Sequence, residues 1–193
     1  MTDPIPFSRL ATLACHDLRT PLATVHGYMR TLEQSELEEP SASYVAIIGT
    51  ASAELAELID ELALAARIDD GRYDPVLREV DSLELARSAA ARLGEDRVVV
   101  SGAGATVRVD PEPTARSLAA LAQSALRHGG VETVQLVVAG RELRLGPVTR
   151  AAAPVVLGEQ LRDLGAAVAG RHLRALGATL RLDDATLAVA LQL

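Results

Sequence analysis

Two apolar stripes limit what the first third of this chain can fold into. The apolar positions recur with spacings that alternate between four and three residues, over residues 11–32 and again over residues 44–65. This spacing is typical of helices that pack in a bundle. Pro40 and a cluster of acidic residues lie between the stripes and predict a short loop. The members are Ala11, Cys15, Leu18, Leu22, Val25, Met29 and Leu32 in the first stripe, and Tyr44, Ile48, Ala51, Leu55, Leu58, Leu62 and Ala65 in the second.

The two stripes predict an antiparallel helical hairpin. A lone hairpin buries only one stripe on each helix, and its natural completion is a second copy of the chain. We therefore expect a homodimer whose two hairpins form a four-helix bundle. Gly71 and Pro75 mark the end of this region, which predicts a first domain over residues 1–72 and a second over residues 73–193.

Short strands alternate with helices in the second domain. We expect one sheet packed against helices, an α+β sandwich. The expected strands lie at 76–80, 97–100 and 106–110, the expected helices at 82–93, 112–127 and 159–176, and two hairpins over residues 133–146 and 179–193.

Charge and composition exclude several classes of partner. The 193 residues carry a formal net charge of −7, which argues against general nucleic-acid binding. The single cysteine, Cys15, excludes an intrachain disulfide and fits a reducing compartment. No run of about 18 apolar residues is evident, so we expect a cytoplasmic protein with no membrane partner. His128 and His172 lack metal-ligand spacing with other histidines, cysteines or acids, so no metal site is predicted.

One polar segment of the first helix could carry chemistry. His16 and Thr20 are four residues apart and share one helix face. Asp17 can accept a hydrogen bond from one ring nitrogen of His16, which fixes the tautomer and leaves the other nitrogen as a nucleophile. Pro21 cannot donate to the carbonyl of Asp17, so the helix is expected to bend or loosen there. The alternative is an ordinary solvated His–Asp pair.

The segment HDLRTPL, residues 16–22, resembles the phosphoacceptor box of bacterial two-component sensor histidine kinases. Residues 65–89 resemble the end of the second dimerisation helix and the entry into the ATP-binding domain of that family. Residues 163–183 resemble the family's second glycine box with its following helix and strand. These stretches occur in the family's order, so the resemblance spans nearly the whole chain.

The resemblance implies a role for each residue of the box. His16 would be the phosphorylated residue, and Asp17 would orient its ring and act as base. Thr20 would position a water for phosphatase action on a response regulator. Arg19 and Pro21 would complete the box.

The chain departs from the family where the resemblance places ATP. Ser124 stands where the family has the asparagine that coordinates Mg²⁺, and the chain contains no asparagine. The family's Asp-x-Gly-x-Gly segment corresponds to residues 144–154, which contain no aspartate and only Gly146 as a glycine. The second glycine box is reduced to residues 164–167, with Gly165 alone. Fewer glycines leave fewer backbone amides that can approach a phosphate closely.

These departures predict that the chain's own ATP-dependent activity is lost. The alternative is a divergent site in which Asp163, Glu159 or Gln160 substitutes for the missing groups. We expect a phosphorelay protein whose His16 accepts a phosphoryl group from a response-regulator aspartate and passes it to another. The chain would bind no cofactor itself, and Mg²⁺ would reside on the partner receiver domain. The second domain would serve as a docking surface for the receiver.

Two rival functions remain open from the sequence. The first is an active histidine kinase with a divergent ATP site. The second is a non-catalytic dimeric scaffold that sequesters a response regulator, with His16 an inherited remnant.

Overall fold

The structure is a computed structural model that describes residues 7–35, 37–94 and 96–193. The chain divides into two compact units, Met1–Arg72 and Tyr73–Leu193. Each unit has its own buried apolar residues.

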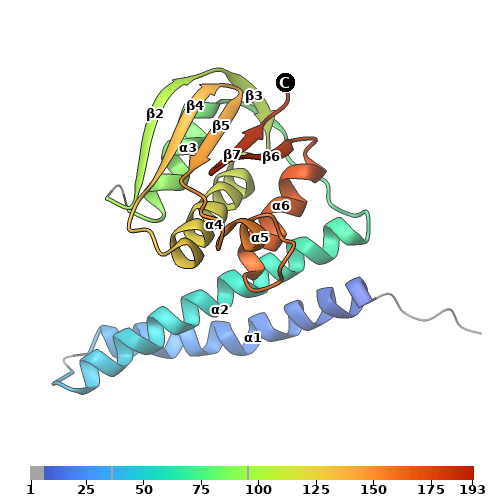
Figure 1. The fold of residues 1–193 in the computed structure, drawn as a ribbon. Coiled ribbons are helices and arrows are strands. Elements are labelled where there is room, and N and C mark those ends of the chain that lie inside the picture. The colour runs from blue at the N-terminus through green and yellow to red at the C-terminus, as the bar shows by residue number, and fades with distance from the viewer. Residues whose placement is uncertain (1–6, 36, 95) are drawn as a thin grey trace, which may run out of the picture. The chain divides into compact units, whose positions relative to one another are not determined.

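The first unit is a hairpin of two long helices, α1 (Phe7–Glu33) and α2 (Ser41–Asp69), which lie side by side in Figure 1. Cys15 of α1 is fully buried against Ile59 and Ala63 of α2. Leu22 and Leu62 pack on this cluster from the two helices. The expected hairpin is confirmed, and α1 stays helical through Pro21.

The positions that α2 buries along most of its length are shifted by one residue from the expected stripe. Val45, Ser52 and Ile59 are buried at intervals of seven, and Ala63 follows. Most of the expected stripe on α2 is exposed instead, with Tyr44 60%, Ile48 49%, Leu55 52% and Leu58 46% exposed. The periodicity detected a second apolar face of α2, which the hairpin itself does not cover.

One helix among the described residues, α2, is long and apolar enough to cross a bilayer by length and composition alone, with a mean hydropathy of 1.3 over its most apolar 18 residues. Small residues such as Ala, Ser and Gly separate the large apolar side chains of α2, so its high mean hydropathy does not come from one uninterrupted run of large apolar residues. Composition of this kind is weak evidence for a membrane span.

The second unit contains two sheets and four helices among the described residues. β2 (Val98–Gly104), β4 (Val134–Gly140), β5 (Glu142–Gly146), β7 (Thr186–Ala190) and β6 (Thr179–Asp183) form one sheet in that order. β2 and β4 run parallel and the other neighbours antiparallel. β1 (Arg78–Asp81) and β3 (Thr106–Val109) form a separate antiparallel pair. The helices are α3 (Ser82–Ala91), α4 (Pro111–Gly129), α5 (Ala153–Val156) and α6 (Leu164–Ala175).

A single core holds this unit together. Leu121 of α4, Leu173 of α6, Leu143 of β5 and Leu187 of β7 are each at most 1% exposed and belong to one apolar cluster. The expected packing of a sheet against helices is confirmed (Figure 1), but the strands expected at 76–80 and 106–110 form the separate β1–β3 pair instead of joining that sheet. The last helix, expected from residue 159, begins only at Leu164, because the Asp163 side chain caps it there.

Candidate functional site

His16 lies on the exposed side of α1, with 78% of its side chain accessible. Its Nδ1 is 3.1 Å from Oδ1 of Asp17. A carboxylate can only accept, so Nδ1 carries the hydrogen and donates it. The lone pair of Nε2 then remains on the exposed ring, which is the arrangement of an imidazole nucleophile oriented by an acid.

The other residues of the HDLRTPL segment surround His16 on α1. Arg19 and Thr20 are exposed and lie three and four positions further along, so both share a face with the imidazole. Pro21 lies within the helix, and the Thr20 carbonyl just before it accepts a hydrogen bond from Oγ1 of Thr24 at 3.2 Å. The structure therefore gathers His16, Asp17, Arg19, Thr20 and Pro21 in little more than one helical turn.

Cys15 belongs to the packing of the hairpin, although it precedes His16. Burial raises the pKa of its thiol, Arg19 lowers the pKa and Asp60 raises it, with burial the largest influence. The thiol therefore stays protonated at neutral pH and is a poor metal ligand or nucleophile. No group of three or more histidine, cysteine or acidic side chains is placed to hold a metal within the described ranges.

One ion pair joins the two helices beside His16. Nη2 of Arg19 donates to Oδ1 of Asp60 on α2 at 2.6 Å. Both side chains are about half exposed, at 52% for Arg19 and 46% for Asp60. The pair lies next to the Cys15–Ile59 packing contact, because Ile59 precedes Asp60 on α2.

The second unit brings together the segments that contain the expected ATP-site positions. Ser124 is on α4, Gly146 ends β5, and Gly165 is in the first turn of α6. A Cβ added at Gly129, at the end of α4, would lie 3.3 Å from Oγ1 of Thr149 in the segment after β5. His128 of α4 contacts Asp163 at the start of α6. The end of α4 therefore adjoins both other segments.

The side chains in this region do not fit a nucleotide and its metal. Ser124 is fully buried, and its Oγ has no hydrogen-bond partner among the described residues. After Gly146, Val148 is 1% exposed and its amide donates to the carbonyl of Ala185 at 2.7 Å. Neither position presents an oxygen ligand for Mg²⁺.

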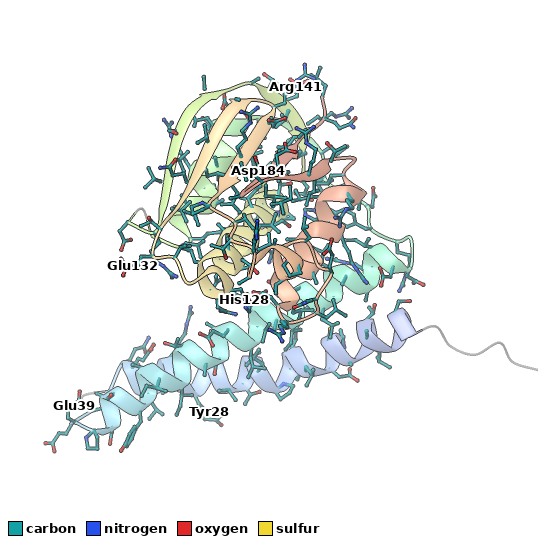
Figure 2. All side chains as sticks on the ribbon, in the orientation of Figure 1. Tyr28, Glu39, His128, Glu132, Arg141 and Asp184 are labelled. Atoms are coloured by element: carbon teal, nitrogen blue, oxygen red, sulfur yellow. The ribbon has the colours of Figure 1, made fainter. Side chains whose placement is uncertain are left out.

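Asp163 fills the place at the N-terminus of α6 where an anion would bind. Its Oδ1 accepts from the amide of Ala166 at 3.1 Å, and its Oδ2 accepts from Nε2 of His128 at 3.3 Å. Nη1 of Arg127 lies 3.9 Å from the same Oδ2. The Asp163 side chain is only 9% exposed. The amides and partial positive charge of a helix N-terminus attract anions, and here the chain supplies its own carboxylate (His128 is labelled in Figure 2).

A buried histidine network was not predicted from the sequence. Ring nitrogens of His172 on α6 pair with the hydroxyls of Tyr73, at 2.7 Å, and of Ser117 on α4, at 2.8 Å. His172 is 0% exposed, and its ring meets that of Tyr73 edge to face. Burial lowers the pKa of His172 to about 4; Asp110 raises it and Arg116 lowers it further. The imidazole is therefore neutral at pH 7, and both of its ring nitrogens are paired within the core.

Comparisons with known proteins agree with this architecture. Residues 8–71 match the family model described as His Kinase A (phospho-acceptor) domain. "Sensor protein DivL" of Caulobacter vibrioides is 30% identical over 142 residues, a match that covers 67% of this chain and 18% of the relative. The chain thus spans about a fifth of the length of that curated relative.

Two solved structures share the fold. Full-length ShkA, in a crystal structure with AMPPNP, superimposes with a TM-score of 0.68 at 22% identity, covering 94% of this chain and 44% of that one. The Acinetobacter baumannii histidine kinase AdeS gives a TM-score of 0.56 at 17% identity, covering 91% of this chain and 98% of that one. At these identities the likeness concerns the fold alone.

Proposed function

Because the chain belongs to the two-component sensor histidine kinase-like family, with a phosphoacceptor hairpin and a domain of the ATP-binding fold, we propose that it is a histidine phosphotransfer protein. His16 accepts a phosphoryl group from a phosphoaspartate on one response-regulator receiver domain and donates it to an aspartate on another. Nothing in the transfer requires a nucleotide on this chain.

The His16–Asp17 geometry carries the proposal. Asp17 holds the hydrogen on Nδ1, and the exposed Nε2 can approach a phosphoryl group on a second protein. During transfer a bond forms between Nε2 and phosphorus while the acyl O–P bond breaks, and the receiver carboxylate leaves with the electron pair. The ring becomes positively charged, and the adjacent Asp17 carboxylate stabilises that charge. Mg²⁺ bound to the receiver supplies the charge neutralisation of the phosphoryl oxygens.

The second unit supports transfer rather than autophosphorylation. Phosphoryl transfer from ATP depends on positioning and on metal-assisted charge stabilisation. Ser124 is buried where an exposed metal ligand would be needed, and Asp163 places a negative charge where phosphate would bind. An anionic phosphate would meet this carboxylate at close range, which disfavours nucleotide binding. We propose that this unit keeps the fold as a receiver-docking surface.

The exposed apolar faces of the hairpin support a homodimer. Leu18, Leu32, Ile48 and Leu55 are each 45–52% exposed. An apolar groove of about 240 Å³ runs between α1 and α2, and Tyr28 at its rim is 71% exposed (Figure 2). Large exposed apolar surfaces on soluble proteins commonly mark sites of association with another protein. A second hairpin would cover it and complete a four-helix bundle.

The decisive experiment offers the full chain two phosphoryl donors in separate reactions. We expect labelling of His16 from phosphorylated receiver domains and none from radioactive Mg-ATP. His16→Gln is the matched control, since it keeps a polar side chain and removes the nucleophile. Labelling from ATP alone would establish an active kinase instead. Unchanged partner binding and output in His16→Gln, with no labelling from either donor, would establish a non-catalytic scaffold.

A further inference from the structure

The Arg19–Asp60 ion pair is placed to respond to the chemical state of His16. Arg19 is three residues after His16 on α1, so their Cβ atoms are about 5–6 Å apart on one helix face. The Arg19 side chain reaches across to α2, where one of its terminal nitrogens donates to Asp60. Arg19 therefore shares a helix face with the proposed phosphoacceptor and also contacts the second helix.

The contact between Arg19 and Asp60 is easily replaced. Both side chains are half exposed, and solvent-exposed ion pairs of this kind add little to stability because water and salt screen them. One terminal nitrogen, Nη2, makes the described bond to one carboxylate oxygen. The guanidinium group has five N–H donors in a planar fork that matches phosphate geometry.

A phosphoryl group on His16 is a stronger partner for Arg19 than Asp60 is. It carries more negative charge than one carboxylate and presents three acceptor oxygens. Hydrogen bonds between two ionised groups are shorter and stronger, and arginine binds phosphate in a bidentate manner. The phosphoryl group also lies on the same helix as Arg19, so no rearrangement of the hairpin is needed to reach it.

We propose that Arg19 exchanges partners, bonding to Asp60 when His16 is unmodified and to the phosphoryl oxygens when His16 carries phosphate. This inference rests on the proposed function for the identity of the modified residue. Phosphorylation then removes one electrostatic tie between α1 and α2 at the level of the Cys15–Ile59 contact. Asp60 competes with the phosphoryl group for Arg19. This competition weakens the interaction between Arg19 and the phosphoryl group and keeps the transfer reversible. Arg19 and Asp60 are positioning residues in this scheme.

The test uses the full chain phosphorylated chemically with phosphoramidate, a small donor that needs no receiver domain. Asp60→Asn keeps the size of the side chain and frees Arg19, and we expect it to slow the loss of phosphoryl from His16 by about two- to fivefold. Arg19→Gln should speed the loss of the phosphoryl group by a similar factor. Arg19→Lys should bring the rate of loss part of the way back to that of the wild type. Glu54→Gln, an exposed charge neutralisation elsewhere on α2, is the matched control.

Two readouts separate partner exchange from a general structural effect. In the Arg19→Gln background, Asp60→Asn should have no further effect on the rate. The ³¹P resonance of the phosphohistidine should titrate at lower pH in Asp60→Asn, because a freed arginine favours the dianion. An unchanged rate in Asp60→Asn, or an equal effect of Asp60→Asn with and without Arg19, would overturn the inference.

The same experiment distinguishes the inference from the proposed function. If phosphorylated receivers fail to label His16 while the chemically phosphorylated chain shows the Arg19 dependence, the transfer function is wrong and partner exchange stands. If receivers label His16 and neither variant alters the rate of loss or the ³¹P titration, the transfer function stands and partner exchange is wrong.

Discussion

Acidification should destabilise the second unit through His172. The pKa of this fully buried histidine is about 4 in the folded chain, whereas an unfolded histidine titrates near 6.5. Between these two pKa values His172 is protonated in the unfolded chain and neutral in the folded chain. The free energy of unfolding therefore falls as pH falls. The contribution is fully present above about pH 6.5 and lost progressively down to about pH 4.

The size of the effect follows from the shift. At 1.36 kcal/mol per pKa unit, the full loss amounts to about 3 kcal/mol, and about 2 kcal/mol of it has occurred by pH 5. This is a large part of the stability of a domain of ordinary size. Protonation would also give both ring nitrogens hydrogens to donate, so each of the Tyr73 and Ser117 hydroxyls would have to accept.

The assay compares the full chain with His172→Gln by hydrogen exchange, read by mass spectrometry on peptides from α4 and α6. Comparison at equal pH cancels the intrinsic exchange chemistry. The variant should be less protected than the wild type at pH 7.5, and the difference should shrink by about 2 kcal/mol at pH 5, because glutamine does not titrate. A difference that stays constant across this range would show that His172 titrates normally and refute the reasoning.

Four further outcomes are expected. Asp163→Ala should lower the free energy of unfolding by about 1–2 kcal/mol, since it removes the α6 cap and the His128 contact. Asp163→Asn should lower this free energy by less, because asparagine caps equally well. Equal losses for the two variants in urea unfolding would contradict this prediction. Ile48→Glu should convert dimers to monomers in sedimentation velocity, because it puts a charge on the exposed apolar face; a wild type that is already monomeric would remove the dimer proposal. Thr20→Ala should slow dephosphorylation of a receiver domain in a phosphate-release assay, and an unchanged rate would exclude a water-positioning role. Ser124→Ala should be neutral or stabilising by up to about 1 kcal/mol in thermal unfolding, since it deletes a buried hydroxyl without a described partner. A marked loss of thermal stability in this variant would show that the hydroxyl makes a hydrogen bond.

Periodicity predicted the elements that depend on local sequence. The helical hairpin, the sheet against helices and the order of strands and helices apart from the short helix α5 follow from apolar spacing and turn residues. β2 extends beyond the expected segment, to Gly104, although Ser101–Gly104 are poor strand formers. These residues are held by register with β4, where Ser101 pairs with Val137 and Gly104 with Gly140. Pairing with a neighbouring strand overrides local propensity, and a single sequence does not reveal the neighbour.

The site was predictable where it is local and unpredictable where it is not. The His16–Asp17 bond joins adjacent residues, and the sequence alone suggests it. The His172 network joins residues that are 99 and 55 positions apart, and no spacing rule links them. The Asp163 contact with His128 spans 35 residues. The capping role of Asp163 does have a sequence signal, because an aspartate followed by a helix-forming run is a capping pattern. The same pattern predicts the correct start of α6.

The departures from the kinase pattern fall at positions where the resemblance places binding groups. Leu121 and Ala125 lie close to Ser124 on α4 and are buried in the apolar cluster, and the small side chain of Ser124 is itself fully buried, so this position packs into the core instead of presenting a ligand. At the start of α6, a helix N-terminus needs a partner for its amides whether or not a phosphate is available. Asp163 supplies that partner from within the chain, and the negative charge that stabilises the helix also opposes an incoming phosphate. A helix capped in this way needs no bound anion for its stability, so the α6 N-terminus is satisfied by the chain's own carboxylate.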